Sequence, residues 1–549
     1  MGGLFCFLST ATGNQQLTPL NWKALMNNTI PWTITTAIPY VNARPHLGFA
    51  LEIVLTDALA RFQRLRGRDV WFLTGTDENS LKNVQAAAEE GIPTQALVDR
   101  NAAAFYDLRE ALNLSFDDFI RTSVDPRHLA GAARLWRACA DHGDIYKQTY
   151  GGLYCVGCET FYTEKELWQG LCPEHLTAPE WVEEENYFFR LSRYEETLLA
   201  LIESGQLRIE PNRRQNEVLN FIRQGLRDFS ISRSVNRARG WGIPVPDDPT
   251  QVMYVWFDAL GNYITALDYA TESAHYRRRW LECPDRIHVI GKGIIRFHAV
   301  YWPAMLLSAG VPLPTTIFVH GYVNVDGQKI GKSLGNAIDP VALVNEYGVD
   351  SVRYYLLREI RAVDDGDFTP ARFVQAHNGD LADRLGNLLN RVMRMIGRYE
   401  HGVIPAPDPA VRGEADARLI MTARQMPALI ESAMSQFLPH DALGAIWGLV
   451  AAGNRYVDEM APWVLAGRRR AGDAEAAALL STTLYNLAEA LRLIAYLCQP
   501  FLPHTAAAIA AQLNVSLEGA WAEATAWGGL PPGRSVQPGP VLFPKLPEA

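Results

Sequence analysis

A strand, a loop and a helix follow one another near the amino terminus, and this unit constrains the fold more than any other feature. Residues 32–37 form a short, largely β-branched run that is typical of a buried parallel strand. Two prolines and an asparagine in residues 38–45 favour a loop. From His46 to Leu65 apolar side chains recur at helical spacing. The unit predicts an α/β sheet in which a helix amino terminus attracts phosphate.

The start of that predicted helix carries His46 and Gly48, directly after Pro45. Gly48 would let a nucleotide lie close to the backbone, and His46 could donate a hydrogen bond to an α- or β-phosphate. The alternative is that His46 only caps the helix. This segment alone does not decide between the two interpretations.

A second phosphate-binding candidate is the segment Lys-Ile-Gly-Lys-Ser-Leu-Gly-Asn at 329–336. Lys329 and Lys332 are flexible point charges that suit the β- and γ-phosphates of ATP. Gly331 and Gly335 would let the loop close over those phosphates. Two lysines in an isolated loop are more often a solvated surface turn, so this segment needs the context of the rest of the chain.

The pattern along the 549 residues predicts several domains. Residues 33–122 alternate strands and helices, and the strand at 69–74 ends at Gly-Thr-Asp-Glu, where open α/β sheets bind ligands. The α/β pattern resumes with predicted strands at 252–256, 286–290 and 316–319. From about residue 367 only helical periodicity remains, which predicts a helical bundle.

Four of the possible metal ligands are closely spaced. Cys155 and Cys158 are followed, thirteen residues on, by Cys172 and His175. Two such pairs can close a tetrahedron around zinc, and four protein ligands leave no open position for catalysis. We therefore expect a structural zinc. The other cysteines lack this spacing and are expected to be buried thiols.

Charge and hydropathy limit the class of protein. The formal net charge of −9 argues against a general nucleic-acid binder but not against an RNA enzyme with a basic face. No apolar run of about 18 residues indicates a membrane span. The first 28 residues fit neither a secretory signal nor a transit peptide well, so we expect a frayed extension, or an early start with Met26 as the true first residue. A cytoplasmic protein is expected.

The chain from about residue 31 to 544 resembles the methionyl-tRNA synthetases, which are class I aminoacyl-tRNA synthetases. The two phosphate-binding candidates match the ATP signatures of that class, and ordered matches to the methionyl branch stand at 37–40, 75–78, 155–158, 185–189, 230–233, 241–244, 254–259, 298, 301–305 and 461–463. The resemblance implies methionine–tRNA ligation by way of methionyl-adenylate. It divides the chain into an N-terminal extension expected to be disordered (1–30), the two halves of a Rossmann-like catalytic domain (31–122 and 233–328), a connective insertion with a zinc knuckle (123–232), a signature loop and stem-contact region (329–366), an all-α anticodon-binding bundle (367–520) and a tail (521–549).

The resemblance also implies the site residues. The methionine pocket would comprise Ala37, Ile38, Tyr40, Asp77, Trp256, Ala259, Leu260, Tyr263, Ile294 and His298. Aromatic and aliphatic groups suit a polarizable thioether, and Tyr40 and His298 could bond near its sulfur. Asp77 would pair with the α-ammonium group. Each aromatic or aliphatic residue alone would be ordinary core.

ATP would be bound, together with Mg²⁺, by Pro45, His46, Gly48, Gly291, Lys329, Lys332 and Ser333, of which His46, Lys329 and Lys332 are the catalytic candidates. The anticodon of initiator and elongator tRNA(Met) would be read by Asn387, Arg391, Pro462 and Trp463. We expect a monomer with no DNA partner.

Four departures from the family pattern affect the nucleotide side: Phe49 for a second histidine, Asn79-Ser80 for His-Gly, Gly293 for an aspartate, and Ile330-Gly331 for Met-Ser. Two other classes therefore stay open. One is an RNA-binding relative without catalysis, and the other is a ligase that charges a non-tRNA acceptor. A synthetase for leucine, isoleucine or valine usually carries a large editing domain, for which the insertion here is short.

Overall fold

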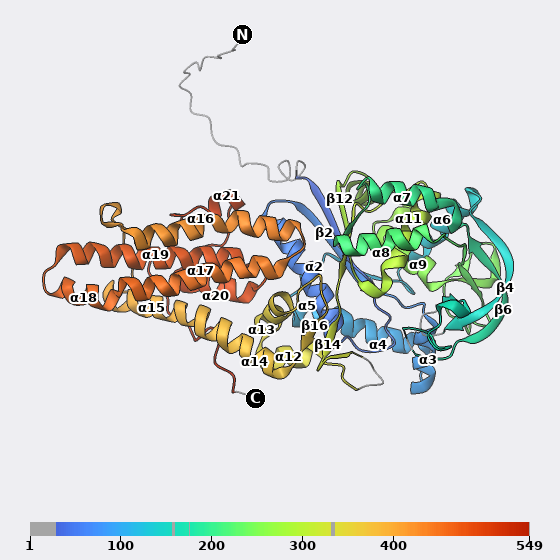
Figure 1. Ribbon diagram of the computed structural model, residues 1–549, viewed down its shortest axis with the longest axis horizontal. Coiled ribbons are helices and arrows are strands. Elements are labelled where there is room, and N and C mark those ends of the chain that lie inside the picture. The colour runs from blue at the N-terminus through green and yellow to red at the C-terminus, as the bar shows by residue number, and fades with distance from the viewer. Residues whose placement is uncertain (1–28, 156–159, 175, 331–334, 548–549) are drawn as a thin grey trace, which may run out of the picture.

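A parallel six-stranded sheet is the centre of the computed structural model, which describes residues 29–155, 160–174, 176–330 and 335–547 (Figure 1). Its order is β3-β2-β1-β12-β13-β7. The strands are β1 (Pro31–Thr36), β2 (Asp69–Thr76), β3 (Asp118–Arg121), β7 (Arg208–Glu210), β12 (Asp285–Gly291) and β13 (Thr316–His320). The predicted strands at 32–37, 69–74, 286–290 and 316–319 are thereby confirmed. Residues 1–28 of the predicted extension lie outside the described residues.

Alternate strand residues face two different hydrophobic cores. In β2, Phe72 belongs to the core around α2 (Leu47–Leu65), whereas Trp71 and Leu73 belong to the core around α6 (Pro126–Asp141), α9 (Val255–Thr265) and α11 (Trp302–Ser308). Side chains alternate across a strand, so a sheet covered on both faces needs apolar residues at consecutive positions. This explains the continuous apolar runs in the sequence.

The other α-helices described in this half are α3 (Leu81–Glu90), α4 (Thr94–Tyr106), α5 (Leu108–Ala111), α7 (Glu195–Glu203), α8 (Asn212–Arg223) and α10 (Ala274–Tyr276).

The insertion is smaller than the predicted range 123–232. β7 lies within that range but pairs with β13 in the parallel sheet, and α6 packs on α9. The part that leaves the sheet is a second, antiparallel sheet of order β5-β4-β6-β8, formed by β4 (Ile145–Cys155), β5 (Thr160–Tyr162), β6 (Glu180–Phe189) and β8 (Phe229–Ser230). It lies at the end of the molecule opposite the helical bundle (Figure 1).

The predicted strand at 252–256 is wrong in its extent and its sheet. β11 (Asp248–Met253) ends three residues earlier and pairs antiparallel with β9 (Ser232–Ser234) and β10 (Pro244–Val245). Tyr254 then caps α9, and Val255 and Trp256 are helical. The apolar run spans a strand end and the start of a buried helix, which periodicity over a few residues does not separate.

A small three-stranded sheet and a helical bundle complete the fold. The sheet holds β14 (Val323–Val325), β15 (Gln328–Lys329) and β16 (Gly366–Phe368). Beside it lie α12 (Pro340–Tyr347) and α13 (Val349–Tyr354), and the bundle comprises α14 (Pro370–Ala376), α15 (Asn387–Tyr399), α16 (Glu414–Ser435), α17 (Pro439–Met460), α18 (Pro462–Arg470), α19 (Ala474–Cys498) and α20 (Pro503–Leu513), followed by the short α21 (Trp521–Ala524). The predicted bundle is confirmed. Its core is continuous with the core around α2.

A buried arginine joins the bundle to the half of the molecule that holds the parallel sheet. Arg353 of α13 is fully buried, and its Nη2 lies 2.7 Å from the Asp57 carboxylate on α2. Its Nε donates to the Phe501 carbonyl (2.8 Å) and its Nη1 to the Leu112 carbonyl (3.1 Å). Phe501 lies between α19 and α20, so one side chain bonds three separate parts of the chain.

Among the helices in the described ranges, none combines the length and the apolar character that crossing a membrane would require.

Candidate active site

The loops after β1 and β2 meet at the carboxyl edge of the parallel sheet. Tyr40 and Asp77 form a parallel bridge, and the Asp77 N–H donates to the Pro39 carbonyl at 2.9 Å. The Ala37 N–H donates to the Val289 carbonyl of β12 at 3.1 Å. Chain order reverses between β1 and β12, and such a switch point is where open α/β sheets bind ligands. Three of the predicted methionine-binding residues are therefore brought to this edge.

A group of aromatic rings lies beside this edge. The Trp256 ring, at the start of α9, stacks on Phe297 with centroids 3.9 Å apart and an interplanar angle of 4°. The Trp256 ring also makes edge-to-face contacts with two other rings. Its centroid lies 6.4 Å from that of Tyr40 and 6.3 Å from that of His298. Stacked and edge-to-face rings favour one another beyond their buried area. The structure thus joins three predicted residues, and it adds Phe297, which sequence reasoning missed although it adjoins His298.

His298 lies in a π-helical turn and is held by two other predicted residues. The Tyr263 hydroxyl donates to its Nε2 at 2.7 Å, and its Nδ1 donates to the Ile294 carbonyl at 3.0 Å. Burial lowers the pKa of His298 to about 4 and raises the pKa of Tyr263, so both side chains are neutral near pH 7. Both ring nitrogens of His298 are occupied in this arrangement. A bond from His298 to a substrate sulfur, as predicted, would require this pair to rearrange.

The aliphatic members of the predicted pocket are buried or half-buried. Ala259 and Leu260 are both buried on α9, and Leu260 belongs to the same hydrophobic cluster as Ala37. Ile38 and Ile294 are half-buried at its border. The ten predicted residues therefore come from the loops after β1 and β2, from α9 and from the segment after β12.

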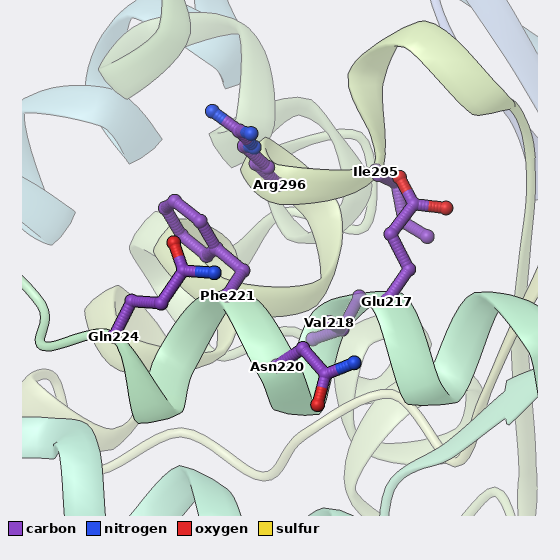
Figure 2. A pocket seen from close by; sticks show the side chains of 7 residues that line it. All are labelled: Glu217, Val218, Asn220, Phe221, Gln224, Ile295 and Arg296. Carbon is purple, nitrogen blue, oxygen red and sulfur yellow. The ribbon is translucent and has the colours of Figure 1, made fainter. Parts of the chain in front are cut away.

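A separate hollow of about 260 Å³ lies on α8 near this segment (Figure 2). The Arg296 guanidinium lies 4.4 Å from the Phe221 ring centroid, and Ile295 also lines the hollow. None of the predicted methionine-binding residues lines it. The hollow therefore adds nothing to the pocket described above.

His46 caps helix α2 and still presents a donor. Its Nδ1 accepts a hydrogen bond from the Gly48 N–H at 3.0 Å. Shielding from water lowers the pKa of His46, so the ring is neutral near pH 7 and carries its proton on Nε2. A Cβ at position 48 would stand 2.9 Å from His46 Cε1, so a larger residue there would displace the His46 ring. The two interpretations of His46 are compatible, because one nitrogen caps the helix and the other can donate.

The two predicted ATP segments lie side by side. The Leu47 N–H donates to the Ile338 carbonyl at 3.0 Å, and a Cβ on Gly48 would lie 4.0 Å from the Ile330 side chain. Lys329 pairs with Asn324 in the β15–β14 ladder. Lys332 and Ser333 lie outside the described residues. The chain thus enters and leaves the lysine loop beside the amino terminus of α2.

Residues next to the predicted ATP ligand Gly291 were not found from the sequence. Gly291 ends β12, and His320 ends the neighbouring β13. His320 Nε2 lies 2.8 Å from the Glu52 carboxylate of α2 and Nδ1 lies 2.7 Å from the Gly321 carbonyl.

Phe49, one of the departures from the family pattern, is buried and packs edge to face on Phe105, with centroids 5.0 Å apart. Position 49 therefore serves the core in this chain.

Two of the four predicted zinc ligands lie in the described ranges. Cys155 and Cys172 are both buried. Cys155 Sγ lies 3.9 Å from Thr177 Oγ1, and the Cys172 N–H donates to the Thr177 carbonyl at 2.9 Å. Cys158 and His175 lie outside the described residues, within which no group of three or more metal-ligating side chains occurs. Both cysteines therefore contact Thr177, Cys155 through its thiol and Cys172 through its backbone, and buried thiols are the soft donors that zinc prefers.

The predicted anticodon residues lie near the end of α17. Asn387 is exposed at the start of α15, and Arg391, one turn later, forms a 2.7 Å ion pair with Asp458 of α17. α17 ends two residues after Asp458, and α18 begins with buried Pro462 followed by Trp463, which is 48% exposed. A large exposed aromatic ring is available for stacking, so Trp463 is not core.

Comparison with known proteins agrees with this architecture. The profile of the family tRNA synthetases class I (M) matches residues 32–178 and 175–393, and that of the anticodon binding domain of methionyl tRNA ligase matches residues 406–549. The sheet and its two signatures define a class I aminoacyl-tRNA synthetase. With matches over most of its length, the chain belongs to the methionyl-tRNA synthetase family.

Individual relatives share nearly half of its residues. The methionine–tRNA ligase of Clostridium perfringens is 43% identical over 518 residues (94% of this chain, 78% of that protein), and that of Brucella suis is 47% identical over 483 residues (86% and 90%). A solved structure of Mycobacterium tuberculosis methionyl-tRNA synthetase in complex with methionyl-adenylate is 44% identical, has a TM-score of 0.89, and covers 94% of this chain and 100% of that one.

Proposed function

We propose that the carboxyl edge of the parallel sheet carries out methionine–tRNA ligation, the reaction of the family, with the residue roles described below. Methionine would lie against Trp256 with its thioether among the aromatic rings, and Asp77 would hold its ammonium group. The single observation that supports this most strongly is that both ATP segments meet at the amino terminus of α2, directly after the loop that carries Tyr40.

The first step needs little from the protein beyond positioning and charge. The methionine carboxylate attacks the α-phosphorus of ATP, pyrophosphate leaves, and methionyl-adenylate remains. Mg²⁺ that arrives with ATP neutralises phosphate charge. The His46 Nε2–H, with Lys329 and Lys332, would stabilise the negative charge that develops on the phosphates. The 2′-OH of the terminal tRNA ribose then attacks the mixed anhydride, and AMP leaves.

Methionine-dependent exchange of pyrophosphate into ATP tests this function, since it needs no tRNA. We expect methionine to support faster exchange than leucine, isoleucine, cysteine or homocysteine. Shape alone gives only about 1–3 kcal/mol of discrimination, so Tyr40→Phe should reduce selectivity if its hydroxyl bonds near the sulfur. Exchange with leucine or cysteine above that with methionine would refute the assignment. Exchange without any charging of tRNA would favour a non-tRNA acceptor instead.

A structural zinc in the knuckle gives a testable result. Cys155→Ser should release one equivalent of zinc and destabilise the β4–β6 hairpin, because the remaining ligands cannot complete the tetrahedron. Elemental analysis measures the zinc content of the purified protein. The rate of proteolysis within residues 145–189 measures the stability of the paired strands β4 and β6. The matched control is Cys139→Ser, a buried cysteine without the metal-ligand spacing, which should retain zinc. Active wild-type protein without zinc would contradict the proposal.

Anticodon recognition by Trp463 is the second testable role. Trp463→Ala should lower the rate of tRNA charging at limiting tRNA by about 10-fold or more, because base stacking on an aromatic ring is worth about 1–3 kcal/mol. Pyrophosphate exchange should not change, since it does not use the anticodon. Val464 is exposed to a similar degree, so Val464→Ala is the matched control. A parallel loss of both activities in Trp463→Ala would point to a folding role.

Three broader predictions belong to the same proposal: the enzyme charges both initiator and elongator tRNA(Met), it is monomeric, and it works in the cytoplasm. The free thiols among the described residues suit a reducing compartment. Light scattering of the purified protein and charging of each tRNA separately would test the first two.

A further inference from the structure

A tyrosine hydroxyl occupies the space that a side chain at position 293 would need. A Cβ built on Gly293 would overlap Tyr322 Oη and would lie 3.4 Å from Cζ of the same ring. The Gly293 N–H also hydrogen-bonds the Tyr322 hydroxyl. In this chain the glycine and the tyrosine therefore depend on one another, and the glycine is the position at which the family pattern has an aspartate.

Both residues lie at the proposed nucleotide edge. Gly293 follows β12 by two residues, and Tyr322 follows β13 by two residues. β12 and β13 are adjacent parallel strands, so their carboxyl ends open on the same side. Tyr322 Cε1 would lie 3.7 Å from a Cβ on Gly291. The tyrosine ring thus stands over the backbone that the sequence predicts to contact ATP.

Neighbouring polar groups fix the position of the tyrosine. Its N–H donates to the Asp365 carboxylate at 2.9 Å. The other Asp365 oxygen accepts from Lys292 Nζ at 2.6 Å, and this ammonium group lies 4.6 Å from the Tyr322 ring centroid. A cation over a ring face and a shared carboxylate hold the three residues as one unit. The hydroxyl is therefore preorganised before any ligand arrives.

The hydroxyl suits a sugar better than a phosphate. Burial raises the pKa of Tyr322 to about 12, so the group is neutral near pH 7 and can both donate and accept. A neutral donor and acceptor matches a ribose hydroxyl, whereas the lysine loop supplies the positive charge that phosphates need.

We propose that Tyr322 is a nucleotide-binding residue whose hydroxyl contacts a ribose hydroxyl of ATP, in the place left by the missing side chain at Gly293. This inference rests on the proposed function, because it assumes that ATP lies along the carboxyl ends of β1, β12 and β13. On this proposal the glycine at position 293 does not cost the protein a contact with ATP, because the Tyr322 hydroxyl supplies one in its place.

The test compares wild type, Tyr322→Phe, Gly293→Ala and the double variant in methionine-dependent pyrophosphate exchange. Tyr322→Phe should raise KM for ATP about three- to tenfold, the effect of one hydrogen bond, and leave KM for methionine unchanged. Wild type should use ATP better than 2′-deoxy-ATP or 3′-deoxy-ATP, and Tyr322→Phe should lose that preference for one of the two. A purely structural role would not change the discrimination between sugars.

The double variant supplies an independent readout. Gly293→Ala alone should weaken ATP binding, because the new Cβ displaces the hydroxyl. In the Tyr322→Phe background the same change should add little, since the nearest ring carbon is at ordinary contact distance. Unchanged KM for ATP and unchanged sugar preference in Tyr322→Phe would overturn the proposal. Absence of methionine-dependent exchange in the wild-type protein would instead overturn the proposed function.

Discussion

Arg353→Met should lower the free energy of unfolding by about 3 kcal/mol, which is the largest stability effect that we expect from any single substitution in this chain. The replacement keeps most of the side-chain volume but leaves the buried Asp57 carboxylate with one fewer cation. It also leaves the Phe501, Pro500 and Leu112 carbonyls without their guanidinium donor. Removing one partner of a buried ion pair costs more than the pair contributes, because the other charge stays desolvated. Urea unfolding followed by tryptophan fluorescence measures the change.

Two further variants make this result specific. Arg372 of α14 is an exposed arginine, so Arg372→Met should change the unfolding midpoint little. The double variant Asp57→Asn with Arg353→Met removes both charges and should regain part of the loss. Cleavage between the catalytic half and the bundle by a protease should also be faster in Arg353→Met. An unfolding midpoint equal to that of wild type would mean that the junction does not depend on this arginine.

His46→Asn should slow methionine-dependent pyrophosphate exchange by about 100-fold or more while the protein stays folded. Asparagine is a preferred helix cap, so its side chain can replace Nδ1 and satisfy the Gly48 N–H. It does not reach the position of Nε2, and removing one preorganised donor from a developing charge typically costs about 3 kcal/mol. The rate of exchange at saturating ATP and methionine measures the effect, with KM for methionine expected to stay near its wild-type value.

His46→Gln is the complementary control. Glutamine places an amide donor near the Nε2 position but does not form the short-range cap, so it should retain more activity than asparagine and lose more stability. A thermal unfolding curve for each variant separates the two roles. If His46→Asn exchanged pyrophosphate at the wild-type rate, the histidine would be a helix cap only.

The parallel sheet could be predicted from the sequence because buried strands leave continuous apolar runs bounded by loop residues. Residues 69–74 and 286–290 show this clearly, and the structure confirms both. The run at 252–256 looks the same but crosses from β11 into α9. β7, with three residues, is too short to be recognised, and only its pairing with β13 places it in the sheet. Strand pairing over long sequence separations is not encoded in local periodicity.

Residues of the candidate site could be predicted from the sequence where a motif identifies them. They could not be predicted where only a contact in the folded protein identifies them. Tyr40, Trp256 and His298 are brought together as the resemblance implies. Phe297 was not found, because its stacking on Trp256 depends on how α9 meets the segment after β12. Tyr322 was missed for a similar reason, since its relation to Gly293 exists only between neighbouring strand ends. The use of both His298 nitrogens also follows from packing alone.

Helix α2 has a consequence for which tRNA molecules can be charged. Its first residues lie at the proposed nucleotide edge, Asp57 in its middle forms an ion pair with Arg353, and its core continues into the bundle. The catalytic edge and the proposed anticodon face are therefore joined by shared packing and not by a loose linker. On this assignment the distance between the catalytic edge and the anticodon face is fixed. A tRNA with extra base pairs in its anticodon arm could reach one end or the other, but not both, even if its anticodon and its acceptor end were unchanged.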